Sequence, residues 1–448
     1  MLGNFEKFLE KEHTPREIWQ SVRGLAYYLR KHGLEDVLDR HDERVLGERF
    51  RAFLDKINEP HPDGRTIVFI VDRPYFLILR EAACLRREGH RAFLFAQDPL
   101  PENLIATFDD VFDGVLDARG NCPLMRKMLP RIEVEVFHVQ CMMWNYTLGR
   151  MVIEHKGKAA VVCEFYDVTS IFAERGVLLT NWSVPMVDHD LSMERYILNH
   201  ADAVITRFPS SVTEDWYSRN GAKLRDMEFQ AYPCAEFISY SDRKISDEDG
   251  VIRLVFGGNL VPVDKNHPPS LFPETTMHQA FGDILEQGIA IDLLHVPHAP
   301  LPEDYPSYTD YHELARRFER FRIMEGVPPD SFSERIADYD FGILLFHFDP
   351  DIVRLGQGQV KGVIATKIFS YLEAGLPVLV NAEYENMAAF VEGNGLGIAV
   401  HSSEIGDIAG KIAAFDYEAS VSNIKRYNEE HGMGREIHRL VALYDEIT

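Results

Sequence analysis

The sequence of 448 residues contains little cysteine and no long apolar run. Its five cysteines are widely scattered, and no two of them form a C-x-x-C pair. We therefore expect reduced thiols, not a disulfide framework or a structural zinc site. No run of about 18 apolar residues is present, so no transmembrane helix is expected. The polar, charged start MLGNFEKFLEKEHTPREIW does not resemble a secretory signal, and we predict a cytoplasmic location.

Positive charge is also scarce. The 47 basic residues are outnumbered by 71 acidic ones, which gives a formal net charge of −24. Such a chain repels a polyphosphate backbone and anionic lipid, so we expect no nucleic-acid partner and no adsorption to a membrane surface. A small basic pocket for a diphosphate remains compatible with this composition.

Several catalytic motifs are missing. Neither G-x-S-x-G nor G-x-x-x-x-G-K-[ST] occurs, which argues against an α/β-hydrolase and a P-loop enzyme. No group of His, Asp and Glu has the sequence spacing of metal ligands, so the expected reaction needs no metal and no cofactor.

What is present is a repeated α/β pattern. A buried strand at 66–71, a helix at 78–89 and a strand at 91–96 form a βαβ unit, which implies a parallel sheet. After a polar linker at 241–250 the pattern restarts. The further expected strands are 114–116, 135–139, 159–164, 203–206, one near 229–232, then 251–258, 289–296, 341–346 and 376–381, with later helices at 311–323, 365–374, 384–392 and 404–414.

The sequence thus predicts an α/β protein with two doubly wound, Rossmann-like domains. The predicted divisions are a helical extension (1–60), a first α/β domain (61–245), a second (246–430) and a C-terminal helix (431–448). Residues 1–58 show apolar residues at helical spacing. They either cap the next domain or form a surface for a partner, including a second copy of the chain.

Ligands of such sheets bind beyond the carboxyl ends of the strands, and two facing domains form a cleft there. The loop FGGNLVPVDKN (256–266) follows the first strand of the second domain. Gly257 and Gly258 allow close approach of the backbone, and their N–H groups are predicted to point at a phosphate. Lys265 adds a positive charge for a diphosphate.

A second candidate segment is ATKIFSYLEAGLPVLV (365–380). Thr366 and Lys367 lie near the start of its predicted helix, where backbone N–H groups favour anions. Ser370 follows one turn later and shares their face. An ordinary amphipathic helix with a glycine cap at Gly375 explains the same pattern.

These segments, with LRREGHRAFLF (85–95) and ERYILNHADAVIT (194–206), resemble the GT-B glycosyltransferases, especially the large retaining group that includes sucrose and mannosyl transferases. The resemblance spans about 66–447. It implies two Rossmann-like domains facing a central cleft, with a nucleotide sugar held by the second domain and the acceptor by the first. The donor-binding residues implied are Gly257, Gly258, Asn259, Lys265, Thr366, Lys367, Ser370 and Glu373.

The sequence departs from the family at several positions. The family's two glutamates, eight residues apart, are replaced by Gly362 and Ser370, and its phosphate-loop arginine is replaced by Asn259. Its N-domain glycine-rich loop corresponds to DRPYF (72–76), and its H-D pair corresponds to Tyr166-Asp167. The usual retaining mechanism is therefore not expected to carry over.

The candidates for a catalytic base are Asp167, Tyr166 and His138, with Glu164 near the same strand end. A structural role competes with catalysis at each of them. The function predicted first is a metal-independent glycosyltransferase acting on an unidentified acceptor, which is a glycan, a protein or a small molecule. Two alternatives stay open: a GT-B-fold sugar-nucleotide epimerase, and a non-catalytic nucleotide-sugar-binding or scaffold protein.

Overall fold

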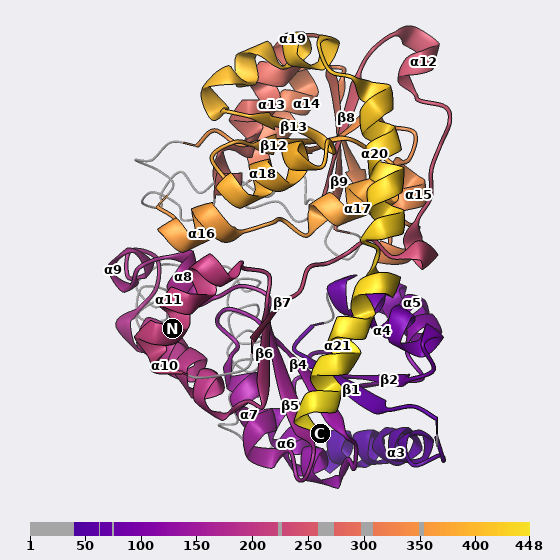
Figure 1. Cartoon of the computed structure of the whole chain (residues 1–448), viewed down its shortest axis with the longest axis vertical. Coiled ribbons are helices and arrows are strands. Elements are labelled where there is room, and N and C mark those ends of the chain that lie inside the picture. The colour runs from indigo at the N-terminus through magenta and orange to yellow at the C-terminus, as the bar shows by residue number, and fades with distance from the viewer. Residues whose placement is uncertain are drawn as a thin grey trace.

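The structure is a computed structural model that describes residues 40–61, 63–73, 76–222, 226–258, 273–296, 308–348 and 354–448. The described chain folds into two parallel sheets, each flanked by helices and stacked along the long axis of the molecule (Figure 1). This confirms the predicted pair of Rossmann-like domains. Among the described helices, none is both long enough and apolar enough to cross a membrane.

The first sheet has seven parallel strands in the order β3-β2-β1-β4-β5-β6-β7. Its central strands are buried along their whole length, as expected where helices cover both faces of a sheet. The strands are β1 (Thr66–Val71), β2 (Arg91–Ala96), β3 (Gly114–Asp117), β4 (Val136–Cys141), β5 (Ala160–Phe165), β6 (Ala203–Thr206) and β7 (Asp226–Glu228). Its helices are α4 (Phe76–Arg87), α5 (Ile105–Val111), α6 (Cys122–Met128), α7 (Thr147–His155), α8 (Thr169–Phe172), α9 (Arg175–Leu178), α10 (Val184–His200) and α11 (Ser210–Asn220).

The second sheet has six parallel strands in the order β10-β9-β8-β11-β12-β13, the doubly wound order with its reversal beside β8. Its strands are β8 (Arg253–Gly257), β9 (Ala290–His295), β10 (Phe321–Glu325), β11 (Phe341–Leu344), β12 (Val378–Asn381) and β13 (Gly397–Val400). Its helices are α12 (Ser246–Asp249), α13 (Met277–Glu286), α14 (Thr309–Arg317), α15 (Phe332–Ile336), α16 (Gln357–Gly362), α17 (Lys367–Glu373), α18 (Glu385–Gly393) and α19 (Ile408–Ala413).

Two expected elements were wrong in detail, and the edge strands β10 and β13 were not expected. The helix expected over 311–323 ends at Arg317, and β10 follows it as the edge strand beside β9. The strand expected near 229–232 is instead β7, three residues earlier. Edge strands are short and only partly buried, so their apolar patterns are weak.

The described part of the N-terminal extension belongs to the first domain. Helix α3 (Arg40–Ile57) buries Leu46, Phe50 and Phe53 in the same core as strand β2. The Phe53 ring meets Phe93 edge to face at 5.6 Å. Helix α3 therefore buries its apolar stripe against the first domain, as expected if this part of the extension caps that domain. Residues 1–39, and any oligomer contact made through them, lie outside the described residues.

The C-terminal helices join the two domains. Helix α20 (Tyr417–Glu430) runs along the second domain, and α21 (Met433–Ile447) continues onto the first, where it packs on α4 (Figure 1). The Tyr444 hydroxyl lies 2.6 Å from His138 Nδ1 in β4, and Asp445 pairs with Arg65 at 2.7 Å. The end of the chain is thus part of the first domain's packing.

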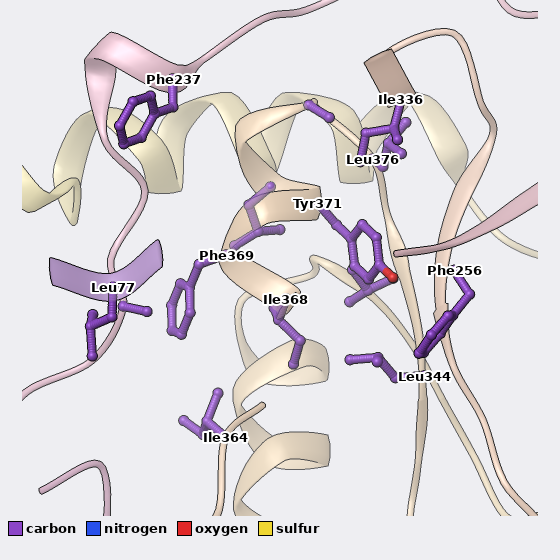
Figure 2. Close-up of a cluster of buried hydrophobic side chains, with 14 of the residues drawn as sticks. Leu77, Phe237, Phe256, Ile336, Leu344, Ile364, Ile368, Phe369, Tyr371 and Leu376 are labelled. Atoms are coloured by element: carbon purple, nitrogen blue, oxygen red, sulfur yellow. The ribbon is translucent and has the colours of Figure 1, made fainter. Parts of the chain in front are cut away.

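Helix α17 forms the centre of the contact between the domains. Its Phe369 points toward Leu77 of α4, whereas Tyr371 points the other way, toward Phe256 (Figure 2). The apolar cluster is therefore continuous across the domain boundary.

A buried ion pair accompanies this apolar contact. Arg80 of α4 donates from Nε to Glu373 Oε1 at 2.8 Å and also pairs with the other carboxylate oxygen. Its Nη2 lies 3.0 Å from Ser370 Oγ, and the backbone N–H of Cys234 donates to Glu373 Oε1 at 2.8 Å. Both charged side chains are 2% exposed. The stability of such a buried pair depends strongly on the relative position of its partners, because moving them apart leaves an uncompensated charge in the interior.

A second contact between the domains is made by α16, which packs on α8 and α11. A Cβ on Gly356 would lie 2.3 Å from the backbone oxygen of Ile171, and one on Gly362 would lie 2.9 Å from Phe208. The Gly356 N–H donates to the Phe172 carbonyl at 2.7 Å. Glycine at these positions lets the two backbones approach closely.

We expect Arg80→Met to lower stability by about 3–5 kcal/mol, because it leaves the Glu373 carboxylate buried without its cation. The double variant Arg80→Met/Glu373→Gln should recover part of this loss, since it removes the stranded charge. Urea unfolding followed by circular dichroism measures both. Arg175→Met is the matched control: it breaks the half-exposed pair with Asp188 and should leave the midpoint unchanged. Equal midpoints for Arg80→Met and Arg175→Met would contradict the assignment.

Candidate functional site

The candidate site lies where the carboxyl ends of the two sheets face each other. Tyr166 and Asp167 directly follow β5 of the first domain, and Thr366 and Lys367 begin α17 of the second. The Tyr166 hydroxyl lies 3.1 Å from Thr366 Oγ1. Four predicted site residues, two from each domain, are thus brought to one place.

Arg207, which the sequence analysis missed, completes this group. It follows β6, is 5% exposed, and its guanidinium stacks over the Tyr166 ring at 4.1 Å. Its Nη2 donates to the Tyr166 carbonyl and lies 3.6 Å from Asp167 Oδ1. Within the described chain its Nε is buried with no hydrogen-bond partner. The signal was available: an arginine directly after a buried parallel strand stands at the edge where ligands bind.

The electrostatics of Asp167 are set by opposing effects. Burial raises the pKa of its carboxyl, and the positive charges of Arg207 and Lys367 oppose that rise. Burial also raises the pKa of the Tyr166 phenol, with Arg207 opposing it. Asp167 nevertheless keeps a third of its side chain exposed. A carboxyl that is accessible and more basic than usual is suited to accept a proton.

The two glycines differ from the prediction. The N–H of Gly257 donates to the Tyr371 hydroxyl at 3.1 Å, and that of Gly258 donates to the Leu294 carbonyl at 3.0 Å. Neither N–H is directed at a phosphate, because both complete the protein's own hydrogen bonds. A Cβ on Gly257 would lie 2.2 Å from the Phe332 ring, so this glycine makes room for packing.

Gly258 makes room for Lys367. It has a φ of +136°, and a Cβ there would lie 2.4 Å from Lys367 Cε. The lysine Nζ lies 5.7 Å from the centre of the Phe256 ring. Gly258 therefore makes space for the lysine side chain. This role differs from the predicted contact with a phosphate.

Ser370 and Glu373 also differ from the donor-binding prediction. Both are buried, and both bind Arg80 of the first domain. Thr366, Ser370 and Glu373 share the face of α17 that meets the first domain. Lys367, which was expected to share the face of Ser370, lies instead on another side, against Gly258. In this arrangement Ser370 and Glu373 hold the domains together and do not face a ligand.

His138 is not at a strand end. It is the third residue of β4, fully buried, and stacked on Phe69 with ring centres 4.9 Å apart. Glu164 is likewise buried within β5. His138 Nε2 lies 3.4 Å from Glu164 Oε2 and 3.9 Å from Glu81 Oε2. The sequence analysis placed His138 and Glu164 at the site. An error of a few residues in the predicted end of a strand is enough to move a side chain from the site into the core.

Two groups in the described chain have the geometry of metal ligands. One is Glu81, His138 and Glu164, and the other is Cys84, Cys234 and Glu236. No sequence spacing revealed either, because their members come from distant elements. All five cysteines are free thiols, as expected, although Cys84 Sγ and Cys234 Sγ lie 3.6 Å apart. Asn259 and Lys265, both predicted to bind the donor, lie outside the described residues.

Comparison with known proteins supports the fold. Residues 307–442 match the family model "Glucosyltransferase 3-like, C-terminal domain", a span that includes Thr366 and Lys367. No curated protein matches the sequence. A solved O-GlcNAc transferase mutant from Thermobaculum terrenum is 13% identical, with a TM-score of 0.50, over 95% of this chain and 76% of that one.

Two further solved structures are similar over most of their length. One is a glycosyltransferase involved in avilamycin A biosynthesis, which is 12% identical with a TM-score of 0.46, over 86% of this chain and 98% of that one. The other is the UDP-GlcNAc 2-epimerase from Neisseria meningitidis bound to UDP-GlcNAc, which is 9% identical with a TM-score of 0.46, over 85% of this chain and 99% of that one. The sheet orders and the Thermobaculum match identify the fold as GT-B, as predicted.

We expect Gly258→Ala to destabilise the protein by about 1–3 kcal/mol, because alanine is strained at this φ and its Cβ displaces the Lys367 side chain. Thermal unfolding measures the loss. Gly393→Ala is the matched control: it lies at the end of α18, and no atom is within 4 Å of the added Cβ. That variant should be neutral or slightly stabilising. A Gly258→Ala protein as stable as Gly393→Ala would contradict the proposed packing.

Proposed function

We propose that the protein is a metal-independent glycosyltransferase that takes its sugar from a nucleotide-sugar donor. The observation that carries the proposal is the meeting of Arg207, Tyr166 and Asp167 from one domain with Thr366 and Lys367 from the other. Two cations and an accessible carboxyl at one place suit a reaction in which a diphosphate leaves and a hydroxyl loses a proton. The match of residues 307–442 to a glucosyltransferase domain supports the same reading.

The donor is proposed to lie against the second domain, with its diphosphate near Lys367 and Lys265. Fixed positive charge stabilises the negative charge that develops on a leaving diphosphate. The Lys367 side chain occupies the space that the missing Cβ of Gly258 leaves, which places its ammonium group beside the loop after β8. Arg207 adds a guanidinium from the first domain, 3.6 Å from the Asp167 carboxylate.

The acceptor is proposed to enter along the first domain, beside Asp167. As general base, this carboxylate accepts the proton of the acceptor hydroxyl, which then attacks the anomeric carbon while the bond to the diphosphate breaks. Tyr166 sits between Arg207 and Thr366 and fixes the distance between the domains at that point. We place the reaction in the cytoplasm, in keeping with five free cysteines.

Lys367→Ala and Lys265→Ala should each weaken binding of a nucleoside diphosphate by roughly 1–3 kcal/mol, as expected for loss of a charge-assisted hydrogen bond. Isothermal titration calorimetry with UDP and GDP measures this. Lys411→Ala, which removes a lysine paired with Glu404 on the surface, is the control and should bind normally. Unchanged affinity in both site variants would refute the diphosphate site.

Incubation with nucleotide sugars and fractionated cell extract should release nucleoside diphosphate. Asp167→Asn should abolish most of this release while leaving nucleotide affinity intact, because it removes the base and not the donor contacts. In the wild type kcat/KM should fall toward acid pH, since the carboxyl is inactive when protonated and its pKa is raised. Asp188→Asn, at an exposed ion pair, should keep full activity.

The same assay separates the alternatives. A sugar-nucleotide epimerase would change the donor sugar without an acceptor, which chromatography of the nucleotide sugars detects. A non-catalytic protein would bind a nucleotide sugar tightly and release no diphosphate with any fraction. Either result would replace the transferase proposal.

A further inference from the structure

The geometry points to a buried site for a divalent transition-metal cation of the zinc type, bound by Glu81, His138 and Glu164 inside the first domain. The site is separate from the proposed transferase site and has a structural role: it joins α4, β4 and β5. It does not depend on the function proposed above.

The three side chains have suitable donor atoms at suitable distances. His138 Nε2 lies 3.4 Å from Glu164 Oε2 and 3.9 Å from Glu81 Oε2, and the three ligand atoms all lie within 4.8 Å of one another. With metal–ligand bonds of about 2.0–2.2 Å, tetrahedral ligands lie about 3.3–3.6 Å apart. The observed spacing needs only small adjustments to enclose a cation.

The orientation of His138 supports a ligand role. Its Nδ1 lies 2.6 Å from the Tyr444 hydroxyl of α21, which can accept the ring N–H. In the tautomer that carries the proton on Nδ1, the lone pair lies on Nε2, which faces the two carboxylates. A metal-binding histidine usually has its other ring nitrogen held by such a partner. Stacking on Phe69 fixes the plane of the ring.

Among the described residues the two carboxylates have one ion-pair partner, His138, which is charged only when protonated. Both oxygens of Glu81 and both of Glu164 are buried without a hydrogen-bond partner in the described chain, and so is His138 Nε2. No lysine or arginine forms an ion pair with either glutamate among the described residues. Two unpaired carboxylates in a dry interior are very unfavourable. One divalent cation neutralises both and satisfies His138 as well.

Gln140 provides an independent indication. It is 1% exposed, and neither atom of its amide has a partner in the described chain. It pairs in register with Glu164 on the neighbouring strand and lies two residues from His138, so all three side chains leave the same face of the sheet. An unsatisfied amide beside the cluster offers one more oxygen ligand or a hydrogen bond to a bound carboxylate.

A proton is the competing occupant. Burial and the nearby Glu164 raise the pKa of Glu81 well above its usual range. Protonation of Glu81 would remove one charge but leave several oxygens of the cluster unsatisfied. A bound metal predicts that a chelator and a Glu→Gln substitution each lower the melting temperature. A bound proton predicts that neither does.

The test begins with the metal content of tag-free protein. The full chain is unfolded in urea and refolded with zinc or with a chelator, because a fully buried site exchanges slowly. We expect about one zinc per chain by mass spectrometry after refolding with zinc, and a melting temperature higher by several degrees than in the chelated protein. Cobalt(II) in place of zinc should give visible absorption bands of a nitrogen and oxygen ligand set, without a thiolate charge-transfer band.

Variants assign the metal to this cluster. Glu164→Gln and Glu81→Gln should each lose nearly all of the metal and melt at the chelated temperature. Cys84→Ser/Cys234→Ser is the matched control for the second group of possible ligands and should keep the metal. The proposal is overturned if the wild type binds no zinc, if the metal is lost only in the cysteine variant, or if Glu81→Gln is as stable as the zinc-loaded wild type.

Discussion

The arrangement of the two domains depends on one buried ion pair. Arg80 and Glu373 are each 2% exposed and come from helices of different domains. Arg80 also binds Ser370, and Glu373 also accepts from the Cys234 backbone. Such a pair contributes little net stability compared with apolar packing, but it penalises any other relative position of its partners. The apolar contact between Phe369 and Leu77 supplies adhesion beside it (Figure 2). Together they fix where α17 stands relative to the first domain.

The position of α17 then determines the candidate site. Thr366 meets Tyr166 at one end of this helix, and Arg80 binds Glu373 at the other. Lys367, on another side of α17, is guided over Gly258 by the shape of the loop after β8. Arg207 and Asp167 arrive from neighbouring strands of the opposite sheet. A short helix fixed at both ends thus helps to bring cations and a carboxyl together.

The polar groups of the first domain divide into two sets with different surroundings. Asp167 keeps solvent access and two nearby cations, so its charge can serve a reaction. Glu81 and Glu164 have neither, so the same kind of side chain becomes a source of strain unless something neutralises it. Burial, and not residue type, distinguishes a reactive carboxyl from a structural one.

The sequence by itself determined the two sheets and the approximate place of the site. Continuous apolar runs such as TIVFIV and RAFLFA are long enough to identify buried parallel strands, and residues after such strands lie at the ligand edge. Tyr166 and Asp167 were singled out because they follow such a strand, and Thr366 and Lys367 because they begin a predicted helix whose N-terminus favours anions. Gly257 and Gly258 were also found, but their role was not, because a sequence does not show which acceptor an N–H will meet.

Only the tertiary structure decided which polar side chains face each other. Arg80 and Glu373 are 293 residues apart, and Tyr444 and His138 are 306 apart, so no local pattern links them. His138 was misplaced because an apolar pattern locates a strand but does not fix its last residue: the expected strand ended at 139, whereas β4 continues to Cys141. Glu373 was assigned to the donor by the family resemblance, and the sequence could not show that packing between the domains turns it toward Arg80. Local sequence fixes what a segment becomes, whereas long-range packing fixes what each of its polar atoms binds.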